Sequence, residues 1–219
     1  MSELNKRVVT SFFLLLIIFF SFLNFKMLSF FLFVLSFMVL VELNNIFKKI
    51  YKNKIFFQLI GNLLSVLYIS YFSVTIFIFL SEKFVDDKST IIFLLIICIS
   101  TDIGGFLFGK LIGGKKLTTI SPNKTYSGAC GSFILALIAG YLYHQIQNSL
   151  SLTNFNIFIF IILISFMSQI GDLLISFLKR KAKIKHTGTI LPGHGGVLDR
   201  IDGMLLAIPI GLLLINVYS

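Results

Sequence analysis

Four aspartates could do chemistry because they lie inside or at the start of apolar runs, where a carboxylate is costly. Asp102 and Asp172 each lie about seven residues from the basic end of their run, roughly 10 Å deep at about 1.5 Å per residue. Asp199 and Asp202 open the last run and, three residues apart, share one helix face. Carboxylates gathered at one membrane face repel unless a cation neutralises them, and hard oxygen ligands favour Mg²⁺. The alternative is an intramembrane pair that carries protons or holds helices together.

Two basic, glycine-containing stretches accompany these acids. The first runs from Ser176 through Lys179, one helical turn later, to Gly196, and the second runs from Gly113 to Thr125. Glycines let backbone N–H groups approach an anion closely, and Lys or Arg side chains neutralise its charge. Basic loops alone are typical of membrane topology, but beside four acids they predict a site for a metal–polyphosphate complex.

The segments that must position these residues are strongly apolar. The 219-residue chain is 57% hydrophobic with a mean hydropathy of +0.96, and its apolar residues come in long blocks. A soluble domain needs more polar surface, so we predict an all-α, polytopic integral membrane bundle. The runs long enough to span number about seven, at residues 8–25, 27–47, 55–80, 90–109, 128–148, 155–178 and 201–218.

Loop charges indicate the orientation of these spans. With the N-terminus inside, every second loop is basic, and all 19 Lys and Arg residues lie inside except Lys26, Lys83 and Lys88. We therefore expect a cytoplasmic (inner) membrane protein whose site faces the cytoplasm, and we attribute the net charge of +10 to topology rather than to nucleic-acid binding. We divide the chain into N-terminal transmembrane helices, 1–100, and a catalytic transmembrane region with two cytoplasmic basic loops, 101–219.

The remaining notable residues are assigned no catalytic role. Glu42 lies near the inside end of the second run and is read as interfacial, and Cys98 and Cys130 are read as packing residues. The N-terminal run resembles a signal peptide but lacks a small-residue cleavage site, so we expect an uncleaved first helix.

At the residues singled out above, the sequence resembles the phosphatidate cytidylyltransferases, the CDP-diacylglycerol synthases. The family signature runs Ser-x-x-Lys-Arg, then Lys-Asp, then Pro-x-His-Gly-Gly-x-x-Asp-Arg-x-Asp. The matching positions are Ser176, Lys179, Arg180, Lys185, Pro192, His194, Gly195, Gly196, Asp199, Arg200 and Asp202. Segments 169–173 and 102–125 match two further family segments, so the resemblance covers roughly residues 102 to 202.

The resemblance implies the reaction CTP + phosphatidate → CDP-diacylglycerol + pyrophosphate, with Mg²⁺ and room for a second cation. An ionised phosphatidate oxygen would attack the α-phosphorus in line, so catalysis would consist of positioning and charge neutralisation. By matching position, Asp172 and Asp199 would hold the metal, supported by Asp102 and Asp202. The phosphates would be held by Lys124, Lys179, Arg180, Lys185 and Arg200. The polar substrate contacts would be Ser176, His194, Ser121, Thr125, Gly195 and Gly196.

Three features depart from the family pattern. His186 stands where the signature has an acid, Tyr126-Ser127 replaces Trp-Glu, and fewer spans precede Asp102 than in the family. Because four acids remain for the metal, we expect the departures to alter nucleotide or lipid preference.

Other functions are left open by the residues. One is a related membrane nucleotidyl- or phosphotransferase that acts on another lipid phosphate, such as a polyprenol or archaeol-type phosphate. Another is an ion-coupled transporter using Asp102 and Asp172, although no inverted repeat is visible and the acids lie at one face. No Walker-type loop or kinase signature is present, so ordinary nucleotide hydrolysis is not indicated. The expected partners are CTP, phosphatidate in the bilayer and membrane lipids, with a homodimer left open.

Overall fold

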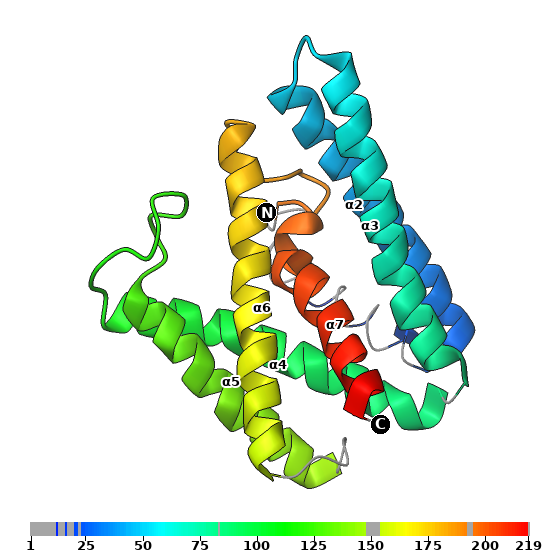
Figure 1. The fold of residues 1–219 in the computed structure, drawn as a ribbon, viewed down its shortest axis with the longest axis vertical. Coiled ribbons are helices and arrows are strands. Elements are labelled where there is room, and N and C mark those ends of the chain that lie inside the picture. The colour runs from blue at the N-terminus through cyan, green and yellow to red at the C-terminus, as the bar shows by residue number, and fades with distance from the viewer. Residues whose placement is uncertain are drawn as a thin grey trace. The chain divides into compact units, whose positions relative to one another are not determined.

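The computed structural model describes residues 12, 16, 20, 21, 23–82, 84–147, 154–191 and 195–218. These residues form six named helices and no β-strand beyond two isolated bridges, which confirms the all-α prediction (Figure 1). The helices are α2 (Phe25–Ile50), α3 (Ile55–Glu82), α4 (Phe84–Leu111), α5 (Tyr126–Gln147), α6 (Asn154–Lys181) and α7 (Leu198–Tyr218).

The helices follow the predicted apolar runs. Within the described residues, α2 to α6 supply five segments long and apolar enough to cross a membrane by length and composition, and the chain is an integral membrane protein. The run at 55–80 is one continuous helix, α3, and the run at 201–218 lies in α7. Most of the run at 8–25 lies outside the described residues, so the count of seven and the inside N-terminus stay predictions.

Helix ends are set by short-range hydrogen bonds. Asn24 caps α2, because its side chain accepts the N–H of Lys26 over 3.0 Å. Thr125 caps α5 in the same way, accepting the N–H of Gly128 at 3.1 Å. Basic residues occupy the last turns of α2, α4 and α6, where a helix end favours positive charge.

The chain packs as two compact units. The first comprises Met1–Phe84 and Leu178–Ile201, and in it α3 runs back along α2 after a short turn (Figure 1). The second comprises Val85–Phe177 and Asp202–Ser219. The functional division expected at residue 100 is a different kind of boundary and stays a prediction.

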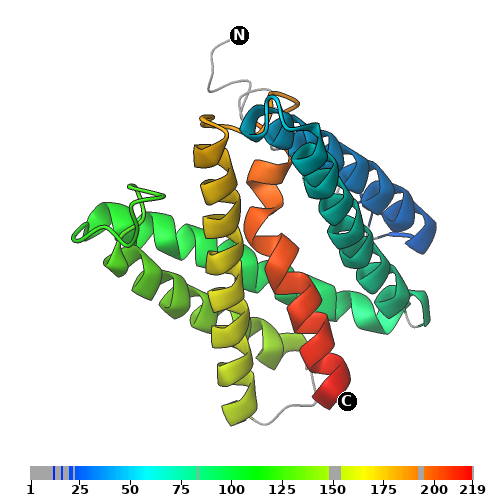
Figure 2. The same ribbon diagram turned by 45° about the horizontal axis from the view of Figure 1, so that its top comes forward.

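In the second unit, small residues let helix backbones approach closely. A Cβ placed on Gly104 of α4 would lie 2.5 Å from the carbonyl oxygen of Gly131 in α5. A Cβ on Gly171 of α6 would lie 2.6 Å from the carbonyl oxygen of Asp202 in α7, and the two helices lie side by side in Figure 2. Close backbone contact of this kind commonly holds helices together in lipid. Lipid tails are as apolar as the side chains, so burial of apolar surface does little to drive helix association there.

Buried hydroxyls add polar contacts to the same unit. Thr101 on α4 donates to the hydroxyl of Ser165 on α6 over 2.8 Å, and Ser132 on α5 donates to the carbonyl of Thr101 over 2.7 Å. These contacts tie α4, α5 and α6 together at Ser165, about two helical turns before Asp172 on α6.

Candidate active site

The end of α6 leads into the first group of site residues. The N–H of Ile184 donates to the carbonyl of Lys179 at 2.9 Å, and that of Lys183 donates to Arg180 at 3.0 Å, the pattern of a Schellman turn. Lys183 has a φ of 56°, the left-handed conformation that this turn requires at its C′ position. The helix therefore stops sharply, and the segment 182–197, here called the α6–α7 loop, begins.

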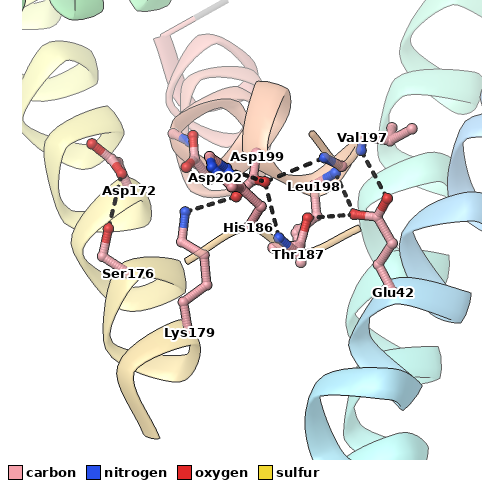
Figure 3. Close-up of polar contacts among 12 residues, drawn as sticks. Glu42, Asp172, Ser176, Lys179, His186, Thr187, Val197, Leu198, Asp199 and Asp202 are labelled. Carbon is pink, nitrogen blue, oxygen red and sulfur yellow. Dashed lines mark hydrogen bonds and ion pairs between the residues drawn. The ribbon is translucent and has the colours of Figure 1, made fainter. Parts of the chain in front are cut away.

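Asp199, in the first turn of α7, is the centre of this group. Its Oδ1 accepts a hydrogen bond from Lys179 Nζ at 2.8 Å. Its Oδ2 accepts the backbone N–H of Thr187 at 2.9 Å and that of Gly196 at 3.3 Å (Figure 3). The Asp199 side chain is only 6% exposed, so protein groups supply most of its polar surroundings.

These contacts decide the charge of Asp199. Burial acts to raise the pKa of its carboxyl group, but the hydrogen bond and charge of Lys179 and the N–H groups of Thr187 and Gly196 outweigh it. The pKa of Asp199 is therefore lowered, and the group is ionised at neutral pH. An ionised, largely buried carboxylate next to an ammonium group is suited to binding a hard cation or to orienting a base toward phosphate.

The glycine-rich part of the loop folds around this carboxylate. Leu191 and Gly195 exchange backbone hydrogen bonds of 3.0 and 3.1 Å. Gly195 has a φ of +86°, a backbone conformation that residues other than glycine rarely adopt. A Cβ there would lie 3.1 Å from Asp199 Oδ2. His186, which replaces the acid of the family signature, has Nδ1 at 3.8 Å from the same oxygen but remains largely exposed.

Glu42 on α2 is a residue that the sequence analysis missed. It is 1% exposed, and its carboxylate accepts hydrogen bonds from the Thr187 hydroxyl at 2.7 Å and from two backbone N–H groups at 2.9 Å, those of Val197 and Leu198 (Figure 3). The interfacial interpretation therefore overlooked a buried acid that binds the loop and the start of α7. The available signal was an acid within an apolar run, the same signal that singled out Asp102 and Asp172.

Asp172 on α6 is the centre of a second group, in the second compact unit. It forms an ion pair with Lys124, and it accepts a hydrogen bond from Ser176 Oγ at 3.3 Å, one turn further along α6. Figure 3 shows the Asp172–Ser176 contact. The side chains of Asp172 and Lys124 are each 26% exposed, so this pair is open to small molecules to a greater extent than the Lys179–Asp199 pair.

The loop at 112–125 fixes the position of Lys124. The N–H of Lys124 donates to the carbonyl of Ser121 at 3.0 Å, and its own carbonyl accepts the N–H of Leu117 at 2.8 Å. Ser127, one of the departures from the family pattern, donates its hydroxyl to the carbonyl of Gly113 and contacts the Thr125 hydroxyl at 2.9 Å. Ser127 thus closes this loop onto the start of α5.

The predicted site residues form a group within each compact unit. It brings together Lys124, Asp172 and Ser176 in one unit and Lys179, Asp199, Gly195 and Gly196 in the other. Ser121 and Thr125 shape the loop that carries Lys124. Asp202 is buried in α7, where it accepts the N–H of Gly203. The exposed members are Asp102, Arg180, Lys185 and Arg200. His194 lies outside the described residues.

Each compact unit contains a carboxylate of the kind that binds a hard cation. Among the described residues, no three His, Cys, Asp or Glu side chains gather in one place. Mg²⁺ does not need such a cage, since it usually binds one or two carboxylates together with substrate phosphates and water. Ionised Asp199 and the partly exposed Asp172 offer carboxylate oxygens of that kind.

The fold and these groups define a class: an integral membrane protein with two acids, one within α6 and one at the start of α7, that are each paired with a lysine. Comparison with known proteins then gives the family. Residues 5–218 match the model of the Cytidylyltransferase family, and the chain belongs to that family. The resemblance found in the sequence is thereby confirmed.

Three curated relatives of this chain are each named phosphatidate cytidylyltransferase. Over 115 residues the chain is 46% identical to the phosphatidate cytidylyltransferase of Helicobacter pylori, a match covering 52% of this chain and 42% of that protein. The enzyme of Brucella suis is 42% identical over 120 residues, 54% of this chain and 44% of that protein. That of Staphylococcus saprophyticus is 38% identical over 143 residues, 64% and 55% respectively. The chain spans about half the length of the curated relatives it matches.

Proposed function

We propose that this protein is a phosphatidate cytidylyltransferase, which transfers CMP from CTP to phosphatidate and releases pyrophosphate. The observation that carries the proposal is the pairing of acids with lysines. Lys179 and Asp199 match the family signature, and Lys124 and Asp172 match the two further family segments. The name shared by relatives in several bacteria supports it.

In the proposed reaction, an oxygen of the phosphatidate phosphate forms a bond to the α-phosphorus of CTP. The bond from that phosphorus to the oxygen bridging to the β-phosphorus breaks, and pyrophosphate leaves with the electron pair. A phosphate monoester is already ionised at neutral pH, so the protein need not remove a proton from the nucleophile. Its task is to orient two anions that repel each other and to offset their charge.

The lysines of the two pairs suit this task. An ammonium group has three N–H donors, so Lys179 and Lys124 can each donate to a phosphate oxygen while remaining bonded to their carboxylates. Ser176 lies one turn from Asp172 on α6 and offers a hydroxyl next to this carboxylate, which is the ion-pair partner of Lys124. We assign the exposed Arg180, Lys185 and Arg200 to attracting and holding the outer phosphates.

We assign the cation to Asp172 and Asp199. Bound Mg²⁺ would supply neutralisation of the triphosphate charge and of the departing pyrophosphate. The lowered pKa of Asp199 supports this assignment, because that carboxylate is ionised at the pH at which CTP carries its full charge.

We place the reaction at the cytoplasmic face of the inner membrane. Lysines occupy the last turns of α2, α4 and α6, whereas no lysine or arginine lies in the last turn of α3, α5 or α7. Basic ends on alternate helices are what the positive-inside rule requires if those ends are cytoplasmic.

The test uses the full chain, purified in detergent and mixed with CTP, phosphatidate and Mg²⁺. We expect release of pyrophosphate together with CDP-diacylglycerol, and loss of both in Asp172→Asn and Asp199→Asn variants that remain folded and inserted. Parallel reactions with other nucleotides and with polyprenyl phosphate measure substrate preference. Product formation from polyprenyl phosphate alone, or ion flux in proteoliposomes with no product, would overturn the proposal.

A further inference from the structure

The most enclosed acid among the described residues of the first unit has no part in the reaction proposed above. Glu42 is 1% exposed, and three donors converge on its two oxygens, as described for the Thr187 hydroxyl and the N–H groups of Val197 and Leu198. Its partners lie 145 to 156 positions away in the chain. The contacts therefore attach α2 to the α6–α7 loop and to the first residue of α7.

Thr187 connects this acid to Asp199. Its hydroxyl donates to Glu42, while its backbone N–H donates to Asp199 over 2.9 Å. The two N–H groups bound by Glu42 belong to residues 197 and 198, directly before Asp199 in sequence. Glu42 thus holds Thr187, which donates to the Asp199 carboxylate, and also the two residues that directly precede Asp199.

Two loop glycines make room for Glu42. A Cβ on Gly196 would lie 2.5 Å from Glu42 Oε2 and 1.9 Å from Thr187 Oγ1. A Cβ on Gly188 would lie 2.8 Å from Glu42 Oε1. Any side chain at either position would push the loop away from the acid, so the glycines and Glu42 form one packing unit.

We infer that Glu42 is a positioning residue for the proposed cytidylyl transfer: it touches no substrate, and it sets the orientation of Asp199 through Thr187 and the start of α7. The inference rests on the proposed function. Buried partners that orient the ligands of a catalytic cation influence turnover without binding the cation themselves.

The first experiment replaces Glu42 by Gln, which keeps the size but places an N–H donor where an acceptor oxygen met donors. We expect kcat for CDP-diacylglycerol formation to fall by about 10- to 100-fold, with the KM for phosphatidate changed less than threefold or so. We also expect the Mg²⁺ concentration for half-maximal rate to rise, because Asp199 is no longer held in place. The matched control is Asn44→Ala, on the same helix, which removes a 3.0 Å contact to Asn62 on α3 and leaves the loop untouched.

A second pair of variants acts at the other end of the contact and keeps the inference testable if Glu42→Gln fails to fold. Thr187→Val removes the hydroxyl that donates to Glu42 and keeps the backbone N–H that donates to Asp199. Thr187→Ser keeps the hydroxyl. We expect Val to lower kcat and Ser to retain it.

Amide hydrogen exchange provides a readout that needs no activity. In Glu42→Gln we expect faster exchange in peptides covering residues 187–199 and unchanged exchange in α3 and α5. If the wild type made no CDP-diacylglycerol, the proposed function would fail while this measurement still tested the role of Glu42. Wild-type kcat and exchange in Glu42→Gln would overturn the inference, as would an equal loss of kcat in Asn44→Ala.

Discussion

Lys179 and Asp199 lie 20 positions apart in the sequence and are joined by a 2.8 Å hydrogen bond from Nζ to Oδ1. Both side chains are mostly buried, at 14% and 6% exposed, unlike the more open Lys124 and Asp172. The two acid–lysine pairs therefore differ in how much each contributes to stability, although we assign both to the same reaction.

Replacing Lys179 by Met should lower the free energy of unfolding by about 1–3 kcal/mol, because a mostly buried carboxylate loses its charged donor. Thermal unfolding in one detergent measures the change. Lys179→Arg, which keeps the positive charge, is the matched control and should lose less. Unfolding of the Met variant at the wild-type temperature would show that the pair does not contribute to stability.

Replacing Lys124 by Ala should change stability by less than about 1 kcal/mol, because its ion pair with Asp172 is partly exposed to solvent. Turnover should nevertheless fall at least tenfold or so, because a phosphate-binding base is lost beside the proposed cation ligand. Lys116→Ala, at an exposed position in the same loop, serves as the control for charge alone. Equal turnover in the two variants would remove Lys124 from the proposed site.

Gly171→Ala should destabilise the second unit by about 1–3 kcal/mol, because its new methyl group would meet the backbone of Asp202 and of Gly203 on α7. Gly140→Ala on α5 is the matched helical control, since the nearest neighbour of its new methyl group, at 3.0 Å, is Cδ1 at the end of the Ile161 side chain rather than backbone. Thermal unfolding of both variants makes the comparison. An α6–α7 contact that accepted the alanine without loss would not be the close backbone contact described above.

Lys183→Gly should raise the free energy of unfolding by up to about 1 kcal/mol, because glycine adopts the left-handed conformation at the end of α6 without the cost that lysine bears. Lys183→Val should lower it, because β-branched residues fit this conformation poorly. The same unfolding measurement serves both variants. If glycine were the more destabilising of the two, the Schellman turn would not be the end of this helix.

Much of the fold could be predicted because lipid imposes simple requirements on sequence. The runs at 27–47 and 55–80 became α2 and α3 with only small differences at their ends. Asp172 and Asp199 could be singled out because an acid beside apolar residues is rare, and the structure gives each a lysine partner. Their common role in binding a cation stays a prediction.

The contacts of Glu42 could not be predicted from the sequence. An acid near the end of an apolar run can face the membrane interface or turn into the protein, and the two cases look the same in sequence. Its partner Thr187 is 145 positions away, and no local periodicity links the two. The role of Thr125 as the cap of α5 is predictable, because threonine is a common residue directly before a helix; the resemblance implies a substrate contact for it instead.

The hydrogen bonds of Glu42 affect how the chain can be divided into fragments. A fragment made of residues 101–219 alone would contain every residue of the family signature but would lack α2. The Thr187 hydroxyl and the N–H groups of Val197 and Leu198 would then have lost their acceptor in a buried setting. We therefore expect a fragment of residues 101–219 to be less stable than the whole chain, and we expect a separately supplied polypeptide that contains α2 to restore part of that stability.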